Sequence, residues 1–270
     1  MQKQETGRHR DEFIAVKRIW MGASTVRMKK DFLEIKDKEC AVFSGDRAEF
    51  LLIQPADDHD MAVLEHQTEL IAAGTDAPFL LAAFKTTDWN AELSPWKAPA
   101  VFGPEPFGDG AAGTLSFIEN ELIPFLREKY GIASDVPAIV GGYSLAAFFS
   151  LWSVYQTDTF AAAAAASPSV WFNGWIEYAE GHQPKARYIY LSLGDREEKT
   201  KNRVMSTVGD CIRRQYRLLA DAGVPSELEW NKGNHFTEPD LRCAKGFIRC
   251  MEALRDNVQP GQTAAEDLPA

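Results

Sequence analysis

The sequence predicts an α/β fold in which helices cover both faces of a mostly parallel central sheet. From Phe50 onward, short all-apolar runs alternate with longer segments whose apolar residues recur at helical spacing. We find neither an internal repeat nor a long linker, so we expect one domain over residues 1–270. A chain of 270 residues, 45% hydrophobic and 25% charged, is ordinary for a globular protein and long enough to bury a sizeable core.

The first 49 residues predict antiparallel strands that extend one edge of the sheet. Four extended segments are separated by charged residues: Phe13–Trp20, Thr25–Met28, Phe32–Ile35 and Cys40–Phe43. The turn signal Ser44-Gly45-Asp46 follows the last of them.

Beyond this region, strands and helices are expected to alternate. The expected strands are short apolar runs, typical of strands buried on both faces: Phe50–Ile53, Phe79–Phe84, Pro137–Val140, Phe160–Ala166, Arg187–Leu193 and Leu228–Trp230. The expected helices have apolar residues on one face: Met61–Ala73, Thr114–Tyr130, Leu145–Tyr155, Val204–Ala222 and Pro239–Leu254. Such alternation requires a largely parallel sheet.

Three segments need separate comment. Pro124 predicts a kink near Asn120, because a proline nitrogen cannot donate the helical hydrogen bond. The six alanines of Phe160–Ala166 favour a helix by propensity, but their position between two helical segments favours a strand. The tail 259–270, rich in Pro, Gly, Ala and acidic residues, is expected to be disordered.

Charge and cysteine usage narrow the classes of function. A net charge of −10 and a pI near 5.1 argue against binding to nucleic acid or to anionic membranes. The polar N-terminus shows no secretory signal, and no apolar run is long enough to span a membrane. Cys243 and Cys250 would lie about 10.5 Å apart along one helix, beyond disulfide reach. We therefore expect a cytoplasmic protein.

The residues from Ala138 to Ala147 predict a nucleophile elbow. A buried strand leads directly into Ser144, and an apolar helix leaves directly after it. Such a turn needs small residues two positions before and after the serine, and Gly142 and Ala146 meet this condition. Ser144 is thus the candidate nucleophile.

A serine becomes a good nucleophile only when an adjacent base takes its proton. Acid and base follow the serine along the chain in hydrolases with this elbow, which leaves His182 and His235 as candidate bases. His182 lies in a polar loop, whereas His235 comes directly after the last expected strand. We favour His235.

The orienting acid is expected after the strand Arg187–Leu193. The following loop offers Glu197 and Asp195, and a Gly-x-x-acid spacing favours Glu197 by a small margin. For the oxyanion hole, the backbone N–H of Leu145 is the first candidate. The second should come from the loop after Phe50–Ile53; Pro55 has no N–H, which leaves Ala56, or else Asp57.

With those residues placed, the sequence resembles the "putative esterase" branch of the α/β-hydrolase superfamily, which includes enterochelin (ferric-siderophore) esterases, feruloyl esterases and esterase D-like enzymes. The likeness extends from about Phe50 to Leu254. Its specific parts are Gly-Gly-Tyr-Ser-Leu-Ala at 141–146, Leu-Gly-Asp-Arg-Glu-Glu at 193–198 and Gly-Asn-His-Phe at 233–236. It implies an α/β-hydrolase fold and a serine esterase that needs no metal or organic cofactor and acts on a small-molecule ester.

Several alternatives stay open. The same residues could serve an acyltransferase, or the fold could carry a non-catalytic binding protein. The run Asp57-Asp58-His59-Asp60 could bind a metal, but it could equally cap a helix, which we prefer. The long loop Lys85–Gly113 carries aromatic residues that either line a substrate pocket or fill the core: Trp89, Trp96, Phe102 and Phe107. The same holds for Trp171, Phe172 and Trp175. A homodimer is possible.

Overall fold

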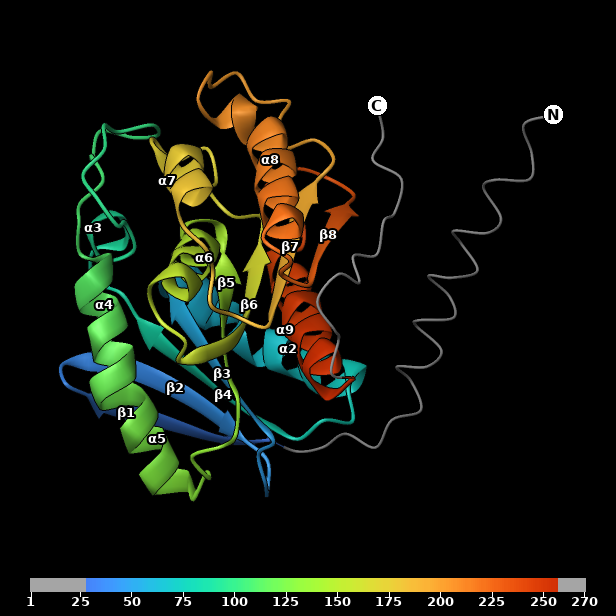
Figure 1. The fold of residues 1–270 in the computed structure, drawn as a ribbon. Coiled ribbons are helices and arrows are strands. Elements are labelled where there is room, and N and C mark those ends of the chain that lie inside the picture. Colours follow the sequence, from blue (N-terminus) through green and yellow to red (C-terminus); the bar gives the residue numbers. More distant parts are fainter. Residues whose placement is uncertain (1–27, 257–270) are drawn as a thin grey trace.

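The computed structural model describes residues 28–256, and its centre is one eight-stranded sheet (Figure 1). The strand order is β1-β2-β4-β3-β5-β6-β7-β8. The strands are β1 (Lys29–Ile35), β2 (Lys38–Ser44), β3 (Phe50–Ala56), β4 (Phe79–Lys85), β5 (Ala138–Tyr143), β6 (Phe160–Ala166), β7 (Tyr188–Gly194) and β8 (Ser226–Asn231).

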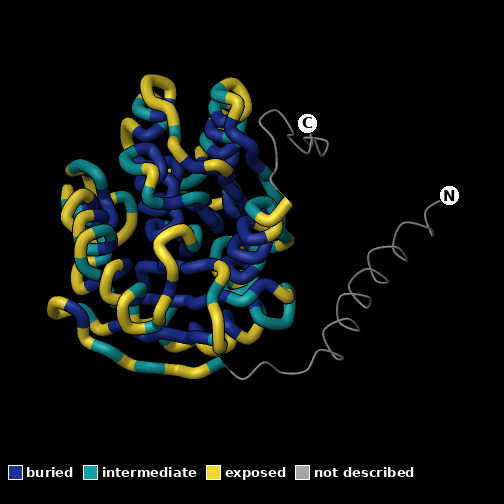
Figure 2. The backbone as a smooth tube through the Cα atoms, turned by 60° about the horizontal axis from the view of Figure 1, so that its bottom comes forward, coloured by how far each residue is buried: buried dark blue, intermediate teal, exposed yellow. Residues whose placement is uncertain are grey.

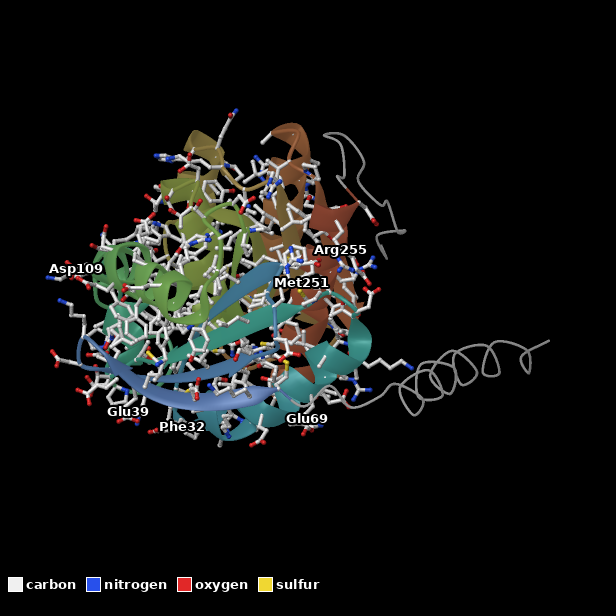
Figure 3. All side chains as sticks on the ribbon, turned by 90° about the horizontal axis from the view of Figure 1, so that it is seen from below. Phe32, Glu39, Glu69, Asp109, Met251 and Arg255 are labelled. Carbon is white, nitrogen blue, oxygen red and sulfur yellow. The ribbon has the colours of Figure 1, made fainter. Side chains whose placement is uncertain are left out.

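The sheet is parallel except at its N-terminal edge. β1 pairs with β2 and β2 with β4 in antiparallel fashion, and all other neighbours are parallel. β1 is the outer strand, and Figure 3 shows Phe32 on this edge, where the residue is 71% exposed. The predicted fold class is therefore confirmed. The expected segments Phe13–Trp20 and 25–27, and the tail 259–270, lie outside the described residues.

Helices cover both faces of the sheet. One face carries α2 (Asp58–Gly74) and α9 (Pro239–Arg255), which pack against each other (Figure 1). The other helices are α3 (Trp89–Glu92), α4 (Ala111–Phe117), α5 (Ile123–Tyr130), α6 (Ser144–Gln156), α7 (Trp175–Gly181) and α8 (Val208–Asp221). The apolar side chains of α4, α5, α6 and α8 belong to the core on the opposite face.

Alternation along the strands divides the interior into two cores. In β3, Leu51 and Ile53 face the core of α4–α6 and α8, whereas Phe50 and Leu52 face the core of α2 and α9. All four side chains are buried, as expected for a strand covered on both faces. Figure 2 shows the resulting buried interior beneath exposed connections.

The alanine-rich segment forms strand β6, as predicted, and packing explains why the strand is favoured. A Cβ added to Gly246 of α9 would lie 3.3 Å from the Cβ of Ala164 and 3.0 Å from the Tyr190 ring. The helix thus approaches the sheet closely, and small side chains on β6 make that approach possible.

The predicted disturbance near Asn120 is present as a π-helical turn, η1 (Ile118–Leu122), between α4 and α5. Pro124 lies in the first turn of α5, where it cannot donate a hydrogen bond to the preceding turn. The structure therefore has two helices and a π turn where one kinked helix is expected.

β3 differs from the expectation because it continues to Ala56, three residues beyond Ile53. The backbone N–H of Leu51 points towards β5, where it donates to the Pro137 carbonyl. The nitrogen of Pro55 points the same way, and Pro55 is tolerated there. The pairing of β3 with β5 ends at Ile53, so no hydrogen bond is lost there.

Three helical segments also depart from the sequence expectations. Helix α3 lies in the segment Lys85–Gly113, where a loop was expected. Helix α7 was not expected, and the helix expected from Val204 begins with the 3₁₀ turn η2 (Met205–Thr207) before α8. Among residues 28–256, no helix combines the length and apolar character needed to cross a membrane.

Candidate active site

Ser144 occupies a strained turn between β5 and α6. Its φ is 57°, in the left-handed region that residues with a side chain rarely adopt. A Cβ built on Gly142 would lie only 2.8 Å from the Cβ of Ala146, so this turn requires glycine at position 142 and a small residue at 146. A positive φ at the serine and small residues two positions before and after it are what a nucleophile elbow requires.

Three side chains from distant parts of the chain meet at this turn. The His235 Nε2 lies 3.0 Å from the Ser144 Oγ, and its Nδ1 lies 2.7 Å from the Glu197 Oε2. His235 follows β8 and Glu197 follows β7, so all three residues lie at the carboxyl edge of the parallel sheet. The His235 side chain is 25% exposed and that of Glu197 is 4% exposed.

The other two candidates lie elsewhere. Asp195 is exposed, and its Oδ1 accepts a hydrogen bond from the Gly233 N–H at 2.8 Å. The ring of His182 stacks on Tyr178, with 3.9 Å between the ring centroids, and its Nδ1 contacts the Tyr178 carbonyl. Between the two carboxylates, only Glu197 contacts the imidazole of His235.

The second oxygen of Glu197 is bound by three further donors. The Oε1 accepts from the Gly194 N–H at 2.7 Å, from the Ser167 hydroxyl at 2.8 Å and from the Arg242 guanidinium at 2.8 Å. Burial alone would raise the pKa of this carboxyl. Hydrogen bonds from His235, Ser167 and Gly194 outweigh burial and lower the pKa, so Glu197 is ionised at neutral pH.

Arg242 is a buried cation, 2% exposed, beside this carboxylate. Its guanidinium also donates to the Tyr143 hydroxyl at 3.0 Å and to the carbonyls of Lys232 and Asn234 at 3.2 and 3.1 Å. The Tyr143 hydroxyl in turn donates to the His235 carbonyl at 2.7 Å. Arg242 thereby connects Glu197 with the loop that carries His235.

Sequence reasoning missed Arg242, Ser167 and Tyr143. Ser167 directly follows β6 at the carboxyl edge of the sheet, and this position could have pointed to it. It also has a positive φ of 48°. Nothing in the sequence distinguishes Arg242 from the other basic residues of α9, because its partners come from elsewhere in the chain.

Leu145 follows β5 and Asp57 follows β3, the neighbouring strand, so their backbone N–H groups are candidates for an oxyanion hole. Leu145 lies in the first turn of α6, where N–H groups have no acceptor within the helix. The carbonyl of Ala56 accepts from Thr86 on the β4 side, so the N–H of Ala56 also faces β4 and away from β5. The backbone N–H of Asp57 faces the β5 side, and its one hydrogen-bond contact with the described residues is a long one of 3.4 Å to the Asp60 Oδ2. The expectation of Ala56 as second donor therefore does not fit the direction of its backbone.

A cavity of about 250 Å³ opens beside His235 and Glu197. Its apolar wall includes Trp171, Met205 and Phe236. Phe102 and Phe107 pack against Trp171, with ring centroids 6.3 and 6.1 Å away. Two of the four aromatic residues named in the long loop 85–113, Phe102 and Phe107, therefore lie behind the cavity wall.

The acidic run 57–60 forms a helix cap. Asp57 is the N-cap of α2, and it exchanges hydrogen bonds with Asp60 in a capping box. Over residues 28–256, no group of three or more His, Cys, Asp or Glu side chains is placed to hold a metal ion.

The profile of the family described as "Putative esterase" matches residues 65–238, more than half of the chain. No curated protein matches by sequence.

Solved structures share the fold. The siderophore hydrolase EstA from Aspergillus nidulans is 18% identical, with a TM-score of 0.66 over 84% of this chain and 94% of its own. The enterobactin esterase FES from Shigella flexneri is 14% identical, with a TM-score of 0.59 over 86% of this chain and 61% of its own. A ferulic acid esterase is also 14% identical, with a TM-score of 0.57 over 83% of this chain and 95% of its own.

Proposed function

Because the chain belongs to the family described as "Putative esterase" and is a carboxylic ester hydrolase, we propose that it cleaves its substrate through an acyl-enzyme on Ser144. In this proposal, His235 is the general base and Glu197 is the acid that orients it. The observation that supports it most is the continuous chain of contacts from the Ser144 Oγ through His235 to Glu197, at 3.0 and 2.7 Å.

The first half-reaction forms the acyl-enzyme. The Ser144 Oγ attacks the ester carbonyl carbon while its proton passes to the His235 Nε2. The ionised Glu197 accepts a hydrogen bond from Nδ1, which fixes the tautomer and stabilises the imidazolium. The tetrahedral intermediate then expels the alkoxide, which takes the proton from Nε2 and leaves as the alcohol.

The second half-reaction releases the acid. His235 takes a proton from a water molecule, whose oxygen attacks the acyl carbon. The Ser144 oxygen leaves and regains its proton from the imidazolium. In both steps the backbone N–H groups of Leu145 and Asp57 would stabilise the oxyanion, and removing one such donor typically costs about 3–4 kcal/mol.

Labelling with a fluorophosphonate tests the nucleophile. We expect the native protein to be labelled and Ser144→Ala to be unlabelled and inactive towards p-nitrophenyl esters. Ser116→Ala, which changes an exposed serine of α4, is the matched control and should behave as the native protein. Labelling that persists in Ser144→Ala, or a fully active Ser144→Ala, would overturn the proposal.

We also propose a small-molecule ester as substrate and the cytoplasm as location. The cavity beside His235 is large enough for either the acyl part or the alcohol part of a small ester. All four cysteines are free, and three of them are buried in the manner of small apolar residues.

A further inference from the structure

The wall of the cavity beside His235 carries an unusual charge distribution. Arg196 and Lys199 line it, and both are exposed to solvent. Neither forms an ion pair with any of residues 28–256. The nearby Glu198 pairs instead with Arg213 of α8, at 3.4 Å.

Among residues 28–256, no free carboxylate lines the cavity to balance these two cations. Of the described residues that line it, Glu197 alone is acidic, and its oxygens are bound by His235 and by the buried Arg242. The chain as a whole has a net charge of −10. Uncompensated positive charge at this position is therefore a local feature, opposite in sign to the rest of the protein.

The remainder of the wall is apolar. Trp171 and Met205 line the interior, and Phe236 lies at the rim with 87% of its surface exposed. The Phe236 ring lies edge-on to the His235 ring, with 5.6 Å between the centroids. A group that fits this cavity would place an apolar body against these side chains and an anionic end towards Arg196 and Lys199.

We propose that the ester hydrolysed by this protein carries an anionic group, a carboxylate or a phosphate, that Arg196 and Lys199 bind in this cavity. The inference rests on the proposed function, since it assigns the substrate class of the same site. Both cations donate charge-assisted hydrogen bonds, which are stronger than those between neutral groups. Because both are exposed, added salt weakens their attraction for an anion.

Matched pairs of esters test the proposal. On the acyl side, the p-nitrophenyl monoester of glutaric acid is compared with its methyl-capped form. On the alcohol side, the butyrate of para-hydroxybenzoate is compared with that of its methyl ester. The butyrate of para-hydroxyphenyl phosphate is compared with that of the neutral dimethyl phosphate triester. The measured quantity is the ratio of kcat/KM for the anionic ester to that for its neutral partner.

We expect this ratio to exceed one in at least one pair for the native protein and to fall with added salt. The pair in which it does so identifies the side of the ester and the kind of anion. In Arg196→Gln/Lys199→Gln we expect the ratio to fall about tenfold, as for the loss of one or two charge-assisted hydrogen bonds. Lys201→Gln/Arg203→Gln, two cations of the same segment outside the cavity wall, should leave it unchanged.

Two outcomes would overturn the inference: neutral esters cleaved as well as the anionic ones in every pair, or a ratio that survives in Arg196→Gln/Lys199→Gln. In either case, hydrolysis that depends on Ser144 would leave the proposed function intact. Failure of the proposed function itself is recognised differently, by a native protein that takes no fluorophosphonate label.

Discussion

The carboxylate of Glu197 has two sets of partners, one for each oxygen. Oε2 contacts His235, whereas Oε1 is bound by Arg242, Ser167 and Gly194. A buried ion pair adds little net stability compared with well-packed apolar residues, because both charges lose their hydration. We infer that the pair is useful here for its geometry, since it fixes the plane of the carboxylate that faces the imidazole.

Amide replacements of the two acids in the loop after β7 should have very different effects. Glu197→Gln should lower kcat by about three to four orders of magnitude, because the amide no longer stabilises the imidazolium or selects its tautomer. Asp195→Asn keeps an oxygen that accepts from Gly233 and should change kcat by no more than a few-fold. Steady-state kinetics with a neutral p-nitrophenyl ester provides the measurement, and the reverse order of effects would assign the acid to Asp195.

Arg242→Gln should affect both stability and the pH profile. Loss of the cation leaves a buried carboxylate without its counter-charge, so the free energy of unfolding should fall by about 3–5 kcal/mol. It should also raise the pKa of Glu197, so the acid limb of the kcat profile should move to higher pH. A purely structural role would leave the position of that limb unchanged.

Lys245→Gln is the control for this variant. Lys245 lies on the same helix, α9, but its pair with Glu229 is partly exposed. We expect a loss of less than about 1 kcal/mol and an unaltered pH profile. Equal effects of the two substitutions, by urea unfolding and by kinetics, would contradict the role given to Arg242.

At the scale of elements, the turn from β5 to α6 determines where the Ser144 hydroxyl points. The small residues around it are required because α6 begins so close to the end of β5. β3 is the strand next to β5 in the sheet, and it is followed by α2. This helix begins at Asp58, directly after β3, and its cap includes the partly buried Asp60.

Gly142→Ala should displace the turn. The new Cβ would lie 2.8 Å from that of Ala146, so the turn must shift, and we expect at least a hundredfold loss of kcat and a loss of about 1–3 kcal/mol in stability. Ala146→Gly in the same chain should restore part of the activity because it removes the overlapping atom. Gly113→Ala in α4, where the added Cβ meets nothing within 4 Å, should leave activity intact. A fully active Gly142→Ala, or an inactive one whose activity Ala146→Gly does not restore, would refute this account of the turn.

Asp60 should make stability depend on pH. Burial, together with the charge of Asp57, raises its pKa from the model-compound value of 3.8 to about 7. The folded state therefore binds a proton more tightly than the unfolded state does. The stability that this tighter proton binding gives the folded state is fully present below pH 3.8, and it is lost as the pH rises towards 7.

Asp60→Asn tests this dependence, because the amide cannot ionise but keeps an oxygen for the cap. We expect the variant to exceed the native protein in unfolding free energy by about 1–3 kcal/mol above pH 7 and to lose much of that advantage near pH 4. Urea unfolding across this range measures the difference. An advantage that does not change with pH would show that ionisation of Asp60 is not its cause.

At the scale of the whole molecule, the features that the sequence predicts are those that depend on local patterns of residues. The sheet, the turn at Ser144 and strand β6 follow from apolar runs and their order along the chain, and the candidates His235 and Glu197 follow from their positions after β8 and β7. Arg242 could not be predicted, because its role depends on contacts with residues 8 to 99 positions away.

The extension of β3 to Ala56 was missed for a similar reason. A proline within a strand usually marks its end, and only the divergence of β5 makes Pro55 acceptable. The direction of the Ala56 backbone, and hence the choice of Asp57 as second oxyanion donor, depends on the same pairing. Helix α7 was not predicted, because its seven residues are too few to show a helical periodicity of apolar residues.

Trapping the covalent intermediate tests the central claim most directly. The native protein is mixed with p-nitrophenyl acetate, quenched in acid during turnover, digested and examined by mass spectrometry. The account predicts an acetyl group on the peptide that contains Ser144, in an amount that matches the initial burst of p-nitrophenol. Steady turnover without any acylated peptide, or an acetyl group confined to another residue, would contradict it.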